Sequence, residues 1–250
     1  MNLIIVALIL TTLAGLSTTI GSFIGIYYKN PGPIYMSFTL GFSAGVMVLV
    51  SFVELLPQAM DSLGFTSAMV AFFVGIFMMF AIDLLVPHKY IMEEQAHEGS
   101  GKIHRTSVLV AFGIAIHNFP EGMVTLAGTL KDIDIGVAMA TAIAIHNIPE
   151  GIAVAVPVYA ATKSAKKAFK WSFISGLSEP VGALVALFVL LPFMSDVVLG
   201  WMLAVVAGFM VFISLDELLP VSHSYGKEHV SILGVCAGMM VMALSLALFL

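Results

Sequence analysis

Long apolar runs dominate this chain and restrict what it can fold into. Eight of them lie between short polar stretches, at roughly 3–28, 35–58, 64–87, 107–130, 135–160, 170–193, 197–221 and 229–250. As a helix, each run is long enough to cross a hydrocarbon layer about 30 Å thick. No run alternates with a period of two, as the strands of a membrane barrel would. The sequence therefore predicts an all-α membrane protein with eight transmembrane helices.

The composition agrees with this class. Hydrophobic residues make up 60% of the chain and charged residues 10%, whereas soluble domains have about a quarter charged residues. We expect a single transmembrane domain over residues 1–250, embedded in a lipid bilayer and without a nucleic-acid partner. The first run has no basic residue before it, so it is predicted to be a membrane helix and not a cleaved signal. The single cysteine, Cys236, excludes an intramolecular disulfide and a cysteine-based zinc site.

The basic residues predict the orientation. Nine of the ten Lys and Arg follow the first, third, fifth or seventh run, and only Lys131 falls on the other side. Because cytosolic loops carry the excess of basic residues, both termini are predicted to lie outside the cytosol. The long cytosolic loop, about 88–106, contains His88, His97, His104, Glu93, Glu94 and Glu98. It is either a solvated charged loop or a mobile segment that collects metal ions.

One hexapeptide occurs twice inside the apolar runs, as residues 117–122 (HNFPEG) and 146–151 (HNIPEG). A His and a Glu four residues apart lie on one face of a helix. If the two helices face each other, His117, Glu121, His146 and Glu150 converge near the middle of the membrane. Two imidazoles and two carboxylates suit Zn²⁺ and are acceptable to Fe²⁺, Mn²⁺ or Co²⁺. The alternative, that these are packing residues, explains a single buried His better than two matched copies.

Further polar residues are candidates for a second, adjacent metal site. Asn118 and Asn147 project about 100° away from the histidines, and Glu179 is a third buried carboxylate at a similar depth. The two Asn side chains are alternatively interhelical hydrogen-bonding groups. Pro120 and Pro149 are expected to kink their helices and to free backbone carbonyls at the membrane centre.

A second phrase is also repeated, as residues 51–57 (SFVELLP) and 214–220 (SLDELLP). Its acids, Glu54, Asp216 and Glu217, are candidates for the two ends of a cation pathway or for helix-end polar contacts. Asp83, His88 and His223 are weaker candidates on the cytosolic side. Both repeated phrases lie on antiparallel helices, a pattern typical of inverted repeats in transporters. It predicts that helices one to three are mirrored by six to eight, with four and five between them.

With these motifs the chain resembles the ZIP (Zrt/Irt-like) family of divalent metal transporters, and within it the bacterial ZupT-like branch. The resemblance rests on both hexapeptides, on residues 176–179 and on the Glu-Leu-Leu-Pro repeats, and it covers essentially the whole chain. It implies an eight-helix 3+2+3 fold with a binuclear centre between helices four, five and six. One site would use His117, Glu121, His146 and Glu150; the other would use Asn118, Glu121, Asn147, Glu150 and Glu179. It further implies that helices one, four, five and six move against the other four, often in a homodimer.

The motifs and the resemblance together predict an importer of Zn²⁺, with Fe²⁺, Mn²⁺, Co²⁺ and Cd²⁺ as further substrates, and the resemblance implies a bacterial inner membrane. The metal would be cargo and not a resident cofactor, and protons would compete with it for the clustered carboxylates. The chain is not expected to be an enzyme. Two alternatives stay open, an intramembrane metal-dependent hydrolase and an exporter of the same ions.

Overall fold

The computed structural model describes residues 3–28, 32–85, 115, 118–190, 193 and 195–249, and every element over these residues is helical. The helices are α1 (Leu3–Tyr28), α2 (Pro33–Val50), α3 (Leu56–Leu63), α4 (Phe65–Leu85), α6 (Ile133–Thr162), α7 (Ala165–Val185), α8 (Asp196–Ile213), α9 (Leu219–Ser224) and α10 (Glu228–Phe249). Three π-helical segments continue these helices: η1 (Ser51–Leu55), η2 (Ala186–Leu190) and η4 (Ser214–Leu218). Residues 118–131 form a further helix.

Seven helical stretches of the described residues are long and apolar enough to cross a membrane. They agree with seven of the eight predicted runs, and α2, η1 and α3 form one of them, Pro33–Leu63. The remaining predicted run, 107–130, is the fourth along the chain, and the structure describes it only at residue 115 and from residue 118 onward. The 88–106 loop, with His88, His97, His104, Glu93, Glu94 and Glu98, lies outside the described residues.

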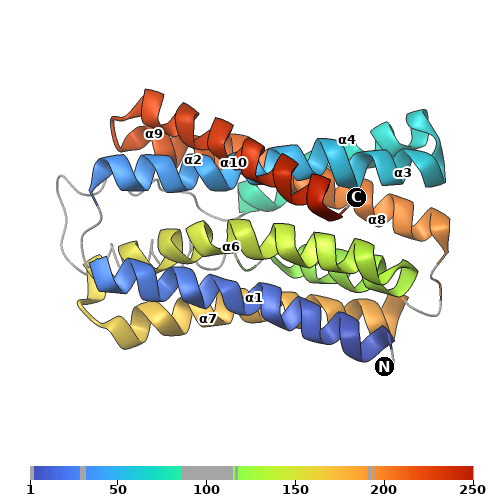
Figure 1. Ribbon diagram of the computed structural model, residues 1–250, viewed down its shortest axis with the longest axis horizontal. Helices are drawn as coiled ribbons and strands as arrows, with labels where there is room; N and C mark the ends of the chain where they lie inside the picture. The colour runs from blue at the N-terminus through green and yellow to red at the C-terminus, as the bar shows by residue number, and fades with distance from the viewer. Residues whose placement is uncertain are drawn as a thin grey trace.

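The helices form two layers (Figure 1). One layer contains α1, α6 and α7, and the other contains α2, α3, α4, α8, α9 and α10. The first residues of α1 and the last residues of α10 lie at the same end of the molecule (Figure 1). Many large apolar side chains on the outside are exposed, with Phe77 66% and Phe188 75% accessible. Such a surface is unusual for a soluble protein and is what a helical membrane protein presents to lipid.

Glycines bring helix backbones into contact within both layers. A Cβ atom on Gly15 of α1 would lie 2.3 Å from the carbonyl oxygen of Gly176 in α7, and one on Gly176 would lie 2.2 Å from that of Gly15. In the other layer, a Cβ atom on Gly45 of α2 would lie 2.1 Å from the carbonyl oxygen of Val235 in α10. No larger residue fits at these contacts. Close packing through small residues is the usual way that helices associate in lipid, where the hydrophobic effect gives little help.

The repeated phrase that ends in Glu-Leu-Leu-Pro forms a π-helical turn in both copies. Leu56 N–H donates to Ser51 O, and Leu219 N–H donates to Ser214 O, five residues back in each case. The residue after each leucine is a proline, which has no N–H to continue the α-helical pattern. The repeat suggested that the two segments are alike, but it did not predict that both form a π-helical turn. Each π-turn contains a predicted pathway acid, Glu54 in η1 and Glu217 in η4.

The start of α7 corrects one predicted boundary. Three lysines expected in the loop before it, Lys166, Lys167 and Lys170, lie within the first turns of the helix and are exposed. The helix begins earlier than expected because Ser164 caps it, its Oγ accepting from Lys167 N at 3.4 Å. The three lysines still lie at the start of α7, so the side of the membrane predicted for them does not change.

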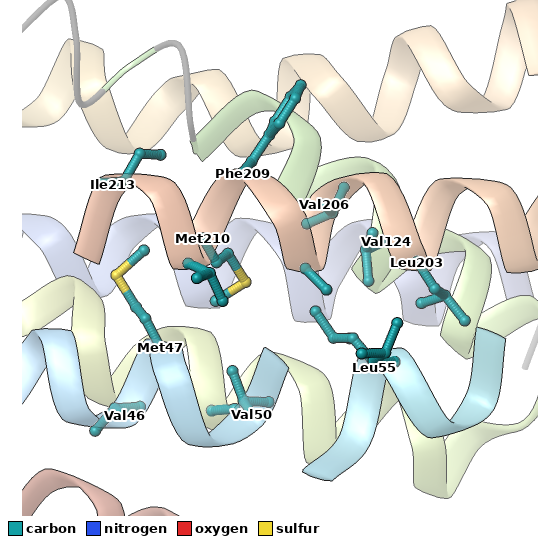
Figure 2. Packing of buried hydrophobic residues seen from close by; sticks show 14 of the residues in the cluster. Val46, Met47, Val50, Leu55, Val124, Leu203, Val206, Phe209, Met210 and Ile213 are labelled. Atoms are coloured by element: carbon teal, nitrogen blue, oxygen red, sulfur yellow. The ribbon is translucent and has the colours of Figure 1, made fainter. Parts of the chain in front are cut away.

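The contact between the layers is apolar over much of its area. Met47 and Val50 of α2 and Val206 and Met210 of α8, all from one layer, lie close to Val124 of the helix over 118–131 (Figure 2), and Val50, Val206 and Met210 line one cavity with Val124 and with Met139 of α6. The four residues of α2 and α8 are buried, and they belong to the largest hydrophobic cluster of the described residues, which also contains Val124. Over this cluster the two layers therefore meet through apolar side chains that make no hydrogen bonds.

Candidate metal site

The two hexapeptides lie on adjacent helices joined by a tight turn. The helix over residues 118–131 is followed at once by Asp132, whose Oδ1 caps α6 by accepting from Asp134 N at 2.7 Å. The helices touch near this turn, because a Cβ atom on Gly136 would lie 2.1 Å from Thr129 Oγ1. This helical hairpin places residues of the first hexapeptide opposite those of the second.

Glu121 and His146 form the first polar pair of the site. His146 Nε2 lies 3.1 Å from Glu121 Oε1, and the two side chains are 0% and 2% accessible. Glu121 belongs to the first hexapeptide and His146 to the second. The predicted convergence of the two motifs is therefore present in this pair.

Asn147 and Glu179 form the second pair and bring α7 into the site. Asn147 Nδ2 donates to Glu179 Oε1 at 2.5 Å and to the backbone oxygen of Ala14, in α1, at 3.0 Å. These two bonds fix which amide atom is which, so Asn147 Oδ1 points elsewhere. Asn147 Oδ1 and Glu179 Oε2 are buried and have no hydrogen-bond partner among the described residues. Both are oxygen atoms of the kind that bind divalent cations.

The remaining predicted ligands are Asn118, Glu150 and His117, which are not part of these two pairs. Asn118 and Glu150 are both fully buried, whereas His117 lies outside the described residues. Over the part of the chain that the structure describes, no three His, Cys, Asp or Glu side chains gather closely enough to hold an ion. Four of the described ligands are instead joined in two hydrogen-bonded pairs, Glu121 with His146 and Asn147 with Glu179. A metal ion would take the place of these bonds, since carboxylate and imidazole atoms that now contact each other would contact the ion.

The prolines near the site do not end their helices. α6 continues without interruption through Pro149, and Pro180 lies inside α7 directly after Glu179. The glycines that close the hexapeptides have a clearer role. A Cβ atom on Gly122 would lie 1.9 Å from Glu179 O, and one on Gly151 would lie 1.9 Å from Thr18 O in α1. Each hexapeptide therefore holds a neighbouring helix backbone beside its own glutamate.

Two backbone features of the site carry no signal in the sequence. The carbonyl of Ala14 orients Asn147, although alanine offers no side chain for this purpose. Ser43 Oγ of α2 donates to the backbone oxygen of His146 at 3.4 Å, which links the second layer to the site. Ser43 is one of many serines in apolar runs, so only the structure distinguishes it.

A small apolar cavity, about 10 Å³ in volume, lies between the layers next to Glu121. Val50, Val124, Met139, Val206 and Met210 are among the residues that line it. It has room for about one water molecule. Glu121 is its only polar lining residue over the described chain. The cavity places Glu121 next to Val50, Val124, Val206 and Met210, which Figure 2 labels.

The predicted pathway acids lie away from these pairs, in the π-turns. Glu54 is buried, and its Oε1 accepts from Gln58 Nε2 at 2.6 Å. Asp216 and Glu217 are half-buried in η4, and Asp83 and His223 are also half-buried. The structure does not bring these residues into the pairs around Glu121 and Glu179.

Replacing Asn147 by Asp tests whether its amide donors matter. A carboxylate would face the Glu179 carboxylate and the Ala14 carbonyl with no proton to share, so we expect the zinc-free protein to lose about 1–3 kcal/mol of stability. Added zinc should restore this loss, because the cation binds both carboxylates. Thermal unfolding in detergent with and without zinc measures both effects. Asn147→Leu, which removes the same amide donors but adds no metal ligand, should be destabilised without zinc rescue; equal rescue in both variants would contradict the assignment.

The amino-acid sequence is similar to those of known proteins over nearly its whole length. A sequence model described as ZIP zinc transporter matches residues 89–246. A protein of Chlorobium phaeovibrioides named zinc transporter ZupT is 52% identical, with 99% of each chain covered. Proteins with the same name from Streptococcus mutans and Corynebacterium aurimucosum are each 48% identical, over 97% and 96% of both chains.

Proposed function

Since this chain belongs to the ZIP zinc transporter family, we propose that it carries Zn²⁺ across the membrane into the cytosol. The observation that supports this most is the meeting of Glu121 and His146, one from each hexapeptide, in a fully buried position. Charged or polar groups are costly at that depth and mark a substrate path. The relatives are transporters and not enzymes, so the hydrolase alternative is set aside.

We propose eight transmembrane helices in a 3+2+3 inverted repeat, with the helix over 118–131 as part of the fourth. Matching contacts support it. Gly45 of α2 packs on α10 as Gly208 of α8 packs on α4, with Cβ-to-carbonyl distances of 2.1 and 2.2 Å. Gly75 of α4 and Gly238 of α10 complete these contacts, at 2.2 and 2.1 Å. The paired π-turns η1 and η4 follow the same relation.

The proposed metal centre is binuclear. One ion would be held by His117, Glu121, His146 and Glu150, and the other by Asn118, Glu121, Asn147, Glu150 and Glu179. Complete burial of Asn118, Glu150 and Glu179 supports this set, as do the two side-chain pairs described above. The nitrogen and oxygen ligands, without thiolate, also suit Fe²⁺, Mn²⁺, Co²⁺ and Cd²⁺ as further substrates.

Transport requires the centre to open to one side at a time. We propose that α1, the helix over 118–131, α6 and α7 move together against the other helices. The apolar contact between the layers suits such a movement, because it has few directional bonds. Glu54 would receive the hydrated cation at the outer mouth, and Asp216 and Glu217 would release it at the cytosolic mouth. Both termini would lie outside the cytosol, in a bacterial inner membrane, in a homodimer.

Uptake by zinc-depleted cells that express the chain tests direction and substrate together. An importer makes these cells accumulate radiolabelled zinc faster than cells with an empty vector, whereas an exporter makes them retain less. Equal accumulation in both would contradict transport of zinc. Competition by unlabelled Fe²⁺, Mn²⁺, Co²⁺ and Cd²⁺ in the same assay gives the selectivity.

A further inference from the structure

Two hydroxyl groups of α1 differ from the rest of that helix. α1 contains six Ser and Thr residues, and four of them donate to a carbonyl three or four residues back: Thr11, Thr12, Ser17 and Thr19. Thr18 Oγ1 and Ser22 Oγ are fully buried and have no partner among the described residues. They lie four residues apart and so share one helix face. A buried hydroxyl without a partner is unfavourable unless water or an ion meets it.

Thr18 occupies the position in α1 that Glu179 occupies in α7. A Cβ atom on Gly15 would lie 3.4 Å from the Cβ of Glu179, and one on Gly176 would lie 3.2 Å from the Cβ of Thr18. The two backbone carbonyls are equivalent as well, because Thr18 O contacts Gly151 and Glu179 O contacts Gly122, each 1.9 Å from a Cβ built there. The two contacts are therefore related by the approximate symmetry of the fold.

By this symmetry, the residue that corresponds to the partner of Glu179 can be named for Thr18. Glu179 accepts from Asn147, in the second hexapeptide. The residue that corresponds to Asn147 in the first hexapeptide is Asn118, which is fully buried. Both Asn118 Nδ2 and Asn118 Oδ1 are without a partner among the described residues. Thr18 and Asn118 are thus the counterpart of the bonded pair Glu179 and Asn147, with the direct bond missing.

Side-chain length explains the missing bond. A threonine oxygen is two bonds nearer its own backbone than a glutamate oxygen, which at about 1.5 Å a bond leaves a shortfall of roughly 2.5 Å. This shortfall is close to the ~2.8 Å length of a hydrogen bond between oxygen atoms. One water molecule therefore has the right size to stand where the carboxylate stands on the other side.

We propose that Thr18 Oγ1 and Asn118 Nδ2 form a neutral half-site on the α1 side of the metal centre: they hold one water molecule that the transported divalent cation retains, while Asn118 Oδ1 stays a ligand of the second ion. The proposal rests on the proposed function. Such a half-site lowers the cost of removing water from the cation, since the cation keeps one ligand of its hydration shell. It makes the centre asymmetric, with a carboxylate contributed by α7 and a hydroxyl contributed by α1.

Thr18→Val tests the half-site, because it removes the hydroxyl at nearly constant size. We expect zinc uptake by proteoliposomes and equilibrium zinc affinity in detergent to fall by about 3- to 10-fold, as for the loss of one net hydrogen bond. Thr18→Ser should keep both near the wild-type values. Thr11→Val is the matched control, since Thr11 is equally buried in α1 but donates to Ala7 O. The melting temperature of Thr18→Val should not fall, because the lost hydroxyl has no protein partner.

A double-mutant cycle tests whether Thr18 and Asn118 act together. After Asn118→Ala, the further change Thr18→Val should cost little, since the two residues hold one water molecule. Independent, fully additive losses would overturn the half-site, and so would wild-type uptake by Thr18→Val. A wild-type protein that neither binds nor takes up zinc would refute the proposed function instead. If wild-type protein takes up zinc and Thr18→Val matches Thr11→Val, only the half-site is wrong.

Discussion

Glu121→Gln is expected to abolish zinc uptake while leaving the protein folded. Glutamine keeps the shape of the side chain and a hydrogen-bonding group opposite His146, which lies 3.1 Å away. It removes the negative charge, however, and Glu121 is proposed to contact both ions. The loss of even an outer-shell partner lowers metal affinity by roughly 10- to 100-fold, so we expect uptake to fall by about 100-fold or more. His146→Ala should have an effect of similar size.

Proteoliposomes with a zinc-sensitive dye inside measure this effect without interference from cellular transporters. Glu228→Gln is the matched control, because Glu228 is exposed in the first turn of α10. Size-exclusion chromatography of each variant separates loss of function from misfolding. Uptake by Glu121→Gln at the rate of Glu228→Gln would remove Glu121 from the transport path.

Gly151→Ala is expected to separate α1 from the metal site. The added Cβ atom would lie 1.9 Å from Thr18 O and 3.1 Å from Ser22 N. These are backbone atoms, so the clash cannot be relieved by turning a side chain. Overpacking in a close-packed interior costs about 1–3 kcal/mol and sometimes more. We therefore expect a lower melting temperature together with loss of zinc uptake, since Glu150 directly precedes this contact.

Gly32→Ala is the control for Gly151→Ala. A Cβ atom on Gly32 meets no atom within 4 Å, and its φ of −65° suits alanine. Gly122→Ala should behave like Gly151→Ala, because its Cβ atom would lie 1.9 Å from Glu179 O. A melting temperature and uptake rate for Gly151→Ala equal to those of Gly32→Ala would contradict the packing described for α1 and α6.

The helices themselves could be predicted from the sequence, and the reason is physical. In a membrane each backbone group must be bonded within its own segment, so a long apolar run has essentially one solution. α1 and α10 accordingly lie close to their predicted ranges, 3–28 and 229–250. Boundaries set by caps were less predictable, as the early start of α7 at Ala165 shows. The π-turns were missed because a repeated phrase does not reveal which hydrogen bonds it makes.

The candidate site was predictable where chemistry and spacing coincide. Two hexapeptides with His and Glu four residues apart predicted the meeting of Glu121 with His146. Asn147 and Glu179 were expected in one site, but the direct bond between them could not be predicted, since it depends on how α7 packs. The role of Ala14 could not be predicted at all, because a backbone carbonyl leaves no mark in the sequence. Gly122 and Gly151 are visible in the sequence as part of each repeat, but only the structure shows which backbone atoms they approach.

Anomalous X-ray diffraction at the zinc edge, from crystals grown with zinc, would locate the ions in the paired hexapeptides. We expect zinc peaks within about 2.0–2.2 Å of the liganding atoms, with one ion between Glu121 and His146 and a second beside Asn147 and Glu179. Glu121→Gln crystals should lose both peaks. Zinc bound only at the helix ends, with no peak beside Glu121 and His146, would contradict the proposal that the paired hexapeptides form the transport site.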